Sequence, residues 1–208
     1  MSLLTNWGYT LTDIDALTEM VTDEEFSEFT AGKYDNDQRV EPNIKAVSQA
    51  IRNYCGWHVY PSSACEMSTT IFDRRVTFRN NNLLIQLPAK YVTSVESVTI
   101  NDVEYTAVAS DPNGLVMVYG VDRAGLQEYS PVVVTYTAGL PDGLMDSIKE
   151  LAAHRITHAL ASSNGVQSET AGGVSITYSA NWTNSARSTA LADDNKEVLA
   201  PYKVQGVF

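Results

Sequence analysis

Two histidines on one expected helix are the first candidates for chemistry in this sequence. His154 and His158 stand four residues apart, which places them on one helical face where both could bind a metal ion. The helical zinc-hydrolase pattern requires a glutamate directly after the first histidine, and Arg155 occupies that position. No third ligand is evident in the sequence. It therefore predicts ordinary surface or interface histidines rather than a metal site.

The other reactive side chains form no catalytic pattern either. Cys55, His58 and Cys65 have ligand-like gaps, but structural zinc uses four ligands and commonly a paired-cysteine spacing. No Gly-x-Ser-x-Gly turn supports a serine nucleophile. The acidic residues between Asp23 and Glu28 lack the alternating oxygen ligands and the glycine of a calcium loop. We therefore expect no catalytic residue, no metal site and no cofactor.

The helix with the two histidines belongs to a strand-to-helix joint between Pro131 and Leu160. The run Val132–Tyr136 predicts a buried strand that breaks at Gly139, and a proline two residues later suits the first turn of a helix. Small and apolar residues mark the inner face of that helix, with Arg155 among them. An arginine in such a place either reaches the surface or pairs with a carboxylate across an interface. The joint is typical of a scaffold.

Residues 10–60 are expected to be helical. A Thr12-Asp13 cap precedes apolar residues at helical spacing between positions 14 and 21, which predicts a first helix. The apolar stripe from Val40 to Tyr54 repeats at intervals of four and three and predicts the strongest helix of the chain. Gly56 ends that helix.

Residues 66–138 are rich in strand signals. Short β-branched and aromatic runs alternate with turn sequences, among them Asn80-Asn81-Asn82, Asn101-Asp102 and Asp111-Pro112-Asn113-Gly114. A helix is expected over 141–163, a flexible loop and strand over 164–186, and a C-terminal helix and tail over 187–208. The predicted fold is α+β: a helical bundle of N- and C-terminal helices with a strand-rich antiparallel insert, in a single connector-like domain over 1–208.

The composition limits the classes of partner. The 208 residues include 14 basic and 25 acidic side chains, a formal net charge of −11, whereas proteins that wrap nucleic acid present a basic face. Tight duplex binding is not expected, although mutual repulsion would let DNA pass without sticking. Two cysteines make no disulfide framework, and the sequence has no run of about 18 apolar residues that would predict a membrane span.

Several local strings together resemble one family of viral proteins. They are IKAVSQAIRNYCG at 44–56, Leu-Pro at 87–88 with VTSVESV at 92–98, the joint from Val132 to Lys149, and the segment 168–178 with LAPY at 199–202. In this order they resemble the head–tail connector (adaptor) proteins of long-tailed bacteriophages and prophages. The likeness covers nearly the whole chain. The strand-rich insert is longer than in the compact helical members, and His154-Arg155 stands where an aromatic-rich ending is common.

The resemblance implies a virion protein of the head–tail junction that is made in the host cytoplasm. It implies a homo-oligomeric ring, commonly dodecameric, that joins the portal protein to the next neck or tail-completion protein. Such a ring extends the DNA channel, and DNA passes through it without sequence-specific binding. No membrane partner is implied. In a head-to-tail ring each subunit uses two different faces, so closure depends on the interface angle.

Three groups of residues are candidates for these contacts. An apolar helix face after a polar stretch near the end of the chain predicts portal docking by Leu191, Val198, Leu199 and Tyr202. A polar, glycine-containing loop predicts channel lining by Gln167, Glu169, Gly172 and Gly173. The candidate for a contact between subunits is Arg155.

Other classes of function stay open. A tail-completion or tail-terminator protein would also form a ring without chemistry, but such proteins are usually dominated by a sheet, which the N-terminal helices disfavour. A small hydrolase would need a site that the sequence does not reveal, and metal analysis with an activity screen would test it. A carbohydrate-binding module could stack sugars on Trp57, Tyr60 or Trp182, although their separation in the sequence favours core or interface roles.

Overall fold

The computed structural model describes residues 7–13, 17–106, 108–162, 168–171, 174–177, 191 and 193–204. Its contacts divide the chain into two compact units. The sheet unit comprises Met1–Thr18, Cys55–Asp142 and Tyr202–Phe208, and the helical unit comprises Glu19–Tyr54 and Gly143–Pro201. Each unit therefore combines segments that lie far apart in the sequence. The single domain expected over 1–208 stays a prediction.

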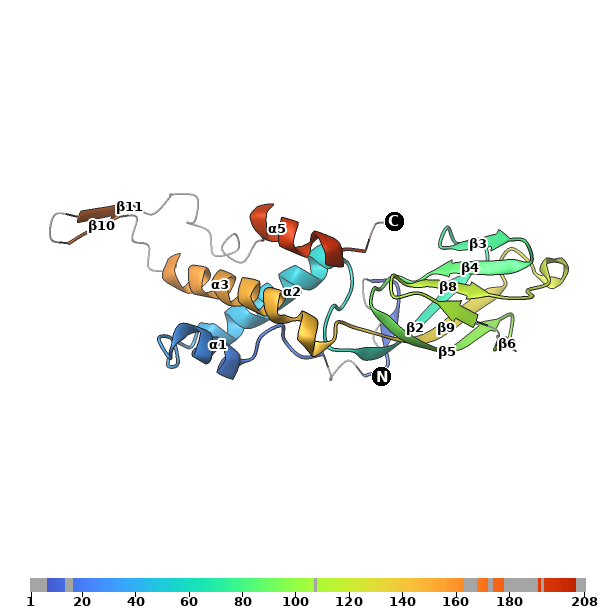
Figure 1. Ribbon diagram of the computed structural model, residues 1–208, viewed down its shortest axis with the longest axis horizontal. Helices are drawn as coiled ribbons and strands as arrows, with labels where there is room; N and C mark the ends of the chain where they lie inside the picture. The colour runs from blue at the N-terminus through green and yellow to red at the C-terminus, as the bar shows by residue number, and fades with distance from the viewer. Residues whose placement is uncertain are drawn as a thin grey trace. The chain divides into compact units, whose positions relative to one another are not determined.

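The sheet unit contains two antiparallel sheets (Figure 1). The strand order is β1-β2-β9-β5-β6 in one sheet and β3-β4-β8-β7 in the other. The strands are β1 (Thr10–Leu11), β2 (Ser63–Thr70), β3 (Val76–Arg79), β4 (Asn82–Gln86), β5 (Val92–Ile100), β6 (Val103–Tyr105), β7 (Val108–Ser110), β8 (Leu115–Val118) and β9 (Pro131–Ala138).

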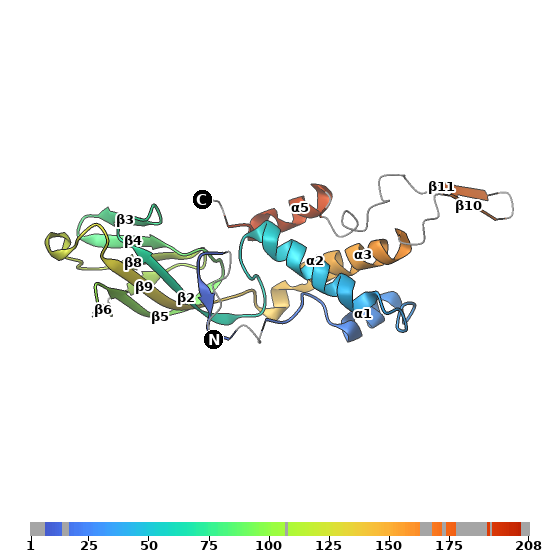
Figure 2. The same cartoon turned by 180° about the vertical axis from the view of Figure 1, so that it is seen from behind.

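The alternation of buried residues along the strands explains why the two sheets lie face to face (Figures 1 and 2). Successive side chains of a strand point to opposite faces, so every second residue can enter the core. The alternate residues buried in this way are Val132, Val134, Tyr136 and Ala138 of β9, Leu83 and Ile85 of β4, and Val116 and Val118 of β8. The sheet unit consequently has a hydrophobic core of its own.

Two tight hairpins follow directly from their asparagine-containing turns. Asn80 and Asn81 have φ angles of 49° and 59° between β3 and β4, and Asn101 and Asp102 have 50° and 64° between β5 and β6. Positive φ at both central residues suits the right-handed twist of the flanking strands, and asparagine and aspartate adopt it more readily than most residues. The turns predicted at these positions are confirmed.

The helical unit is built from α1 (Asp23–Thr30), α2 (Val40–Cys55), α3 (Asp146–Ser162) and α5 (Asp193–Leu199). Both α1 and α5 contact α3, and the Tyr54 hydroxyl of α2 donates to the Lys196 carbonyl of α5 at 3.1 Å. Apolar residues at helical spacing fill the space between the helices. The central ones are Ile44, Val47 and Ile51 of α2 and Ile148, Ala152 and Ile156 of α3.

The predicted strand-to-helix joint is confirmed. Strand β9 ends at Ala138, a 3₁₀ turn η2 covers Asp142–Leu144, and α3 begins at Asp146. Gly139 has a φ angle of 150°, and a Cβ atom at this position would lie 2.3 Å from the Ser62 Cα. Only glycine fits so close to another backbone in this conformation.

The predicted helical bundle with a strand-rich insert is wrong. The strands form two sheets with their own core, so this region is a compact unit rather than an insert in a bundle. The helix expected after Thr12 is also wrong over the residues that are described. Strand β1 pairs with β2 instead, and residues 17–22 are not helical. Met20 is buried and its N–H donates to the Ser48 hydroxyl at 2.9 Å, so the apolar spacing reflects packing of an irregular segment.

The C-terminal third has both strand and helix. Strands β10 (Ser168–Ala171) and β11 (Val174–Thr177) pair antiparallel, with Glu169 opposite Ile176. The expected loop therefore includes a strand at 168–171, because these residues find a ladder partner in the strand predicted after them. Helix α5 confirms the predicted C-terminal helix from Asp193 onward, and a 3₁₀ turn η4 covers Ala200–Tyr202.

Candidate functional site

The histidines considered as metal ligands lie apart from any ligand set. His154 is exposed, and its ring meets the edge of Phe29 at a centroid distance of 4.9 Å. Its Nε2 lies 3.7 Å from Glu150 Oε1, one turn earlier on α3. Among the residues that the structure describes, no three His, Cys, Asp or Glu side chains gather as metal ligands.

Cys55, Cys65 and His58 are buried in the sheet unit. Burial raises the pKa of each thiol to about 12, which leaves both cysteines protonated at neutral pH. His58 Nε2 lies 2.8 Å from the Ala138 carbonyl and Nδ1 lies 2.7 Å from the Tyr9 hydroxyl. A carbonyl only accepts, so Nε2 carries the hydrogen and, in the neutral ring, Nδ1 accepts from Tyr9. This arrangement holds the N-terminal segment against the end of β9.

The tryptophan considered for sugar stacking is not available at a surface. Trp57 is fully buried, and its indole N–H donates to the Tyr202 carbonyl at 2.7 Å. Its ring stacks on Tyr91 at a centroid distance of 6.4 Å. Tyr60 is half-buried, and Trp182 lies outside the described residues. Trp57 therefore has a core role within the sheet unit.

The four residues predicted to dock on the portal have different exposure. Val198 is exposed at the surface of α5, whereas Leu199 is fully buried. Leu191 and Tyr202 are half-buried. The structure therefore does not bring the four together as one apolar face, and Val198 is the member with its side chain most open to solvent.

The predicted channel loop and the predicted subunit contact are placed as follows. Gln167, Gly172 and Gly173 lie outside the described residues, and Glu169 lies in β10. Arg155 is buried on α3, so its guanidinium lies within the helical unit of the single chain. Both assignments stay predictions.

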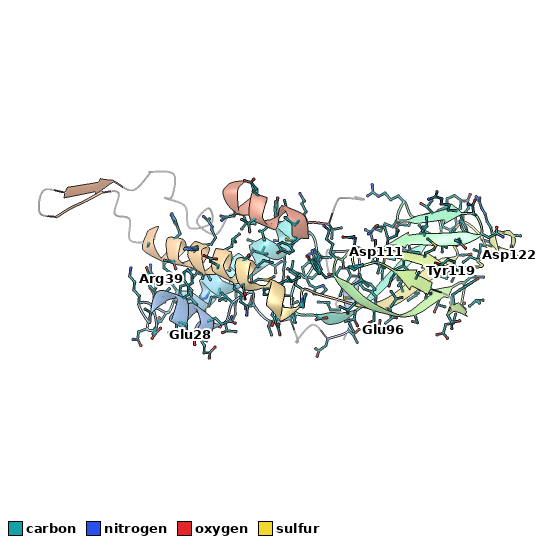
Figure 3. All side chains as sticks on the ribbon, in the orientation of Figure 1. Glu28, Arg39, Glu96, Asp111, Tyr119 and Asp122 are labelled. Carbon is teal, nitrogen blue, oxygen red and sulfur yellow. The ribbon has the colours of Figure 1, made fainter. Side chains whose placement is uncertain are left out.

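An acidic face on α1 presents carboxylates without counter-ions. We define this acidic face by Asp23, Glu24 and Glu28, which are exposed and form no ion pair within the described part of the chain. Figure 3 labels Glu28 on α1. Glu25 differs, because it pairs with Lys149 of α3 at 2.6 Å and completes the capping box with Thr22. Burial opposes ionisation of Glu25, but the hydrogen bonds from Lys149 and Thr22 prevail and hold its pKa below its ordinary value.

Two of the carboxylates around the groove beside α1 are paired locally. This groove of about 510 Å³ is lined by Asp23 and by residues of the loop before α2. Asp37 in that loop binds Arg39 at 2.6 Å, and this hydrogen-bonded pair lowers the Asp37 pKa to about 2. Glu41 similarly pairs with Lys45 at 2.6 Å. Among the described residues, the carboxylates of this region that form no ion pair are therefore those of the acidic face and Asp35.

A second surface lies at one end of the sheet unit, near the loop that holds Asp122 (Figure 3). It is a groove of about 530 Å³ between the turn after β2, strand β3 and the 3₁₀ turn η1 (Arg123–Gly125). We call it the tip groove. Its apolar lining includes Phe72, Phe78 and Leu126, and its charged lining consists of Asp73, Arg74, Arg123 and Glu128.

The arginines of the tip groove lie near carboxylates, and the charge of Arg74 helps to lower the pKa of Asp73. Arg74 and Arg123 are exposed and form no ion pair with any described residue. Arg123 instead lies over the ring of Phe78, with its Cζ 5.4 Å from the centroid. The sequence analysis missed this surface. The sequence feature that could have indicated this surface is Phe72 directly before three charged residues at a turn, because an aromatic residue at such a turn is not needed for the core.

A model of the head completion protein family matches residues 19–190, most of the chain. The chain belongs to this family. The predicted recognition of a phage head–tail connector or completion protein is thereby confirmed, and the match includes both α1 and the tip groove. It ends before α5. None of the curated proteins compared with the chain matches it.

Membership in this family makes the chain a structural head-completion protein of a phage and a component of the virion. The helices of the described chain are all too short or too polar to cross a bilayer.

Proposed function

We propose that the protein forms a ring of identical subunits that joins the portal protein to the next neck or tail-completion protein and extends the DNA channel. The observation that carries this proposal is that each compact unit exposes large apolar side chains of its own. Among the described residues they are Phe72, Val103, Leu115, Tyr119 and Tyr129 in the sheet unit and Phe29, Leu144 and Val198 in the helical unit. A head-to-tail ring needs two different contact surfaces on every subunit, and two such surfaces are available here.

The family match supports head completion over the tail-completion alternative. The N-terminal helices no longer count strongly against that alternative, since sheets make up one whole unit. The distinction therefore depends on the family and on the partner that the protein binds.

The charge of the chain supports passage of DNA rather than binding. A net charge of −11 repels phosphates, so a wall built from such subunits would not hold the duplex. We assign the channel surface to the segment with Gln167, Glu169, Gly172 and Gly173, which is polar and has no basic residue. Arg155, which is buried on α3, stays our candidate residue for the contact between subunits.

Portal docking is assigned to the C-terminal segment, with Val198 as the contact residue. Its side chain is 45% exposed on α5, whereas the buried Leu199 anchors the same helix in the helical unit. Leu191 and Tyr202, which flank the helix in the sequence, stay candidates for the same docking. Complete burial of a fully exposed valine contributes about 1.5–3 kcal/mol, so the part of Val198 that is still exposed would contribute about 1 kcal/mol.

The test is reconstitution with the portal protein of the same phage. Native mass spectrometry and electron microscopy should show a ring of this protein on the portal, and Val198→Asp should weaken that binding. Val103→Asp is the matched control, because Val103 is 55% exposed but lies in β6 of the sheet unit. The proposal fails if no ring forms on the portal. The assignment of Val198 fails if both substitutions have the same effect.

A further inference from the structure

The acidic face and the tip groove have complementary chemistry. The acidic face offers three exposed carboxylates that form no ion pair among the described residues, next to Phe29, which is 43% exposed. The tip groove offers two exposed arginines that form no ion pair with a described residue, beside Phe72, which is 64% exposed, and it is also lined by Asp73 and Glu128. Each surface therefore combines exposed charged groups with an aromatic ring that water partly covers, and the arginines of the groove can pair with carboxylates of the acidic face.

We infer that the acidic face of one copy docks in the tip groove of a second copy of this chain. This contact rests on the proposed ring and names its interface. Glu24 and Glu28 would pair with Arg74 and Arg123, since carboxylates and guanidinium groups form charge-assisted hydrogen bonds. Phe29 would enter the groove, whose apolar lining can cover an aromatic side chain.

The groove favours a protein partner over nucleic acid. Asp73 and Glu128 line it together with the two arginines, and their carboxylates would face the phosphates of a docked duplex. Burial opposes ionisation of Asp73, but the hydrogen bonds from the Arg75 N–H and Thr69 prevail and hold its pKa below the ordinary value. Asp73 therefore stays negative. The separate carboxylates of a protein surface can reach Arg74 and Arg123 while staying clear of Asp73 and Glu128, whereas the continuous row of phosphates on a duplex would bring like charges together.

The pairing of two different surfaces has a geometric consequence. A contact between the acidic face of one copy and the groove of the next is heterologous, so repetition gives a ring when the rotation closes. A stable interface buries about 1,200–2,000 Å² in total, and a few aromatic and arginine side chains near its centre carry most of its energy. Phe29, Phe72 and Arg123 are such residues here.

Two complementary charge-reversal variants test the contact. The groove variant carries Arg74→Glu and Arg123→Glu, and the helix variant carries Glu24→Lys and Glu28→Lys. In each variant alone, groove and helix have the same sign of charge. In an equal mixture, the acidic groove meets the basic helix and the native groove meets the native helix, so both contacts are complementary again.

We expect self-association on the portal to weaken about tenfold or more in each variant alone and to return in the mixture, measured by sedimentation and native mass spectrometry. The matched controls are Lys90→Glu with Lys203→Glu, and Glu66→Lys with Glu104→Lys. They make the same charge changes in the sheet unit outside the groove and should leave association unchanged. Circular dichroism should show all variants folded.

Several results would overturn the contact. Unchanged association of either variant alone would do so, as would a mixture that does not recover. Loss of duplex DNA binding by the groove variant, with association intact, would assign the groove to nucleic acid instead. If the unmodified protein forms no ring on the portal, the proposed function itself fails. This failure can be told apart from failure of the proposed contact, because it is seen with the unmodified protein before any variant is made.

Discussion

Replacing Tyr9 and Tyr136 by phenylalanine should change the stability of the sheet unit in opposite directions. The two rings are 1% and 0% exposed, and their centroids lie 6.2 Å apart. The Tyr9 hydroxyl accepts from the His58 N–H at 3.0 Å and donates to His58 Nδ1 at 2.7 Å. The Tyr136 hydroxyl is buried without a hydrogen-bond partner among the described residues. The buried hydroxyl is therefore hydrogen-bonded in Tyr9, whereas in Tyr136 it has no hydrogen-bond partner among the described residues.

The size of each change in the free energy of unfolding depends on which buried polar groups lose a hydrogen-bond partner when the hydroxyl is removed. Tyr9→Phe strands two buried groups of His58, and each unpaired group costs about 1–3 kcal/mol. We expect the free energy of unfolding to fall by about 2–4 kcal/mol. Tyr136→Phe removes a polar atom whose desolvation nothing offsets, so the free energy of unfolding should rise by about 1 kcal/mol.

Guanidinium unfolding followed by tryptophan fluorescence measures both changes. Trp57 reports on the site directly, because its ring lies 5.4 Å from His58 in the same unit. Far-UV circular dichroism should be recorded alongside, since a chain with two units need not unfold in one transition. Equal losses in the two variants, or a loss above about 1 kcal/mol for Tyr136→Phe, would refute this hydrogen-bond assignment.

Three further changes have clear expected results. Gly139→Ala should lower the free energy of unfolding by at least about 2 kcal/mol, measured by thermal unfolding, because Gly139 has a positive φ angle and lies against the backbone of Ser62. Gly143→Ala should change it by less than about 1 kcal/mol, because no atom lies within 4 Å of the added Cβ. Cys55 and Cys65 should resist a thiol reagent at pH 8 until the protein unfolds. Folding raises the pKa of both thiols from 9.0 to about 12, so the unfolded chain loses these protons at a lower pH than the folded chain does. The stability that the two thiols contribute is therefore complete below pH 9 and is lost as the pH rises from 9 toward 12, which unfolding measured along an alkaline titration should show. Glu25→Gln should lower the free energy of unfolding by about 0.2–1 kcal/mol at pH 7 and leave it unchanged in acid. Because the pKa of Glu25 lies below its ordinary value of 4.5, the carboxylate stabilises the fold above about pH 4.5 and stops doing so as the pH falls further. Urea unfolding at the two pH values measures this difference.

The parts of the fold that were predicted from the sequence are those encoded within a few residues. The turns at Asn80 and Asn101 depend on the local tolerance of asparagine for positive φ. The end of α2 at Gly56, which has a φ angle of 79°, depends on the same freedom in glycine. The joint at Gly139 combines a strand run with a helix start. None of these needs knowledge of a distant partner.

The errors arose where the partner is distant. Strand β1 exists because Thr10 pairs with Glu66 and Leu11 with Cys65, more than fifty residues along the chain. The apolar residues near Met20 have helical spacing, yet the hydroxyl of Ser48 binds that backbone and the segment stays irregular. The two-sheet core could not be predicted either, because strand order is a property of packing that no single strand carries.

The candidate contact surface shows why function was harder to predict than fold. In the sequence, the acidic residues from Asp23 to Glu28 look alike and predict a solvated helix face. The folded chain distinguishes them, because Glu25 binds Lys149 from a position 124 residues away while Glu28 has no counter-ion within the described residues. A charge already paired inside the chain has little to gain from a partner, whereas an unpaired one beside an exposed ring gains both a counter-ion and burial. The surface available for assembly therefore consists of the charged groups that form no ion pair among the described residues of the folded chain. Charge reversal of Glu28, and not of Glu25, should consequently affect the ring.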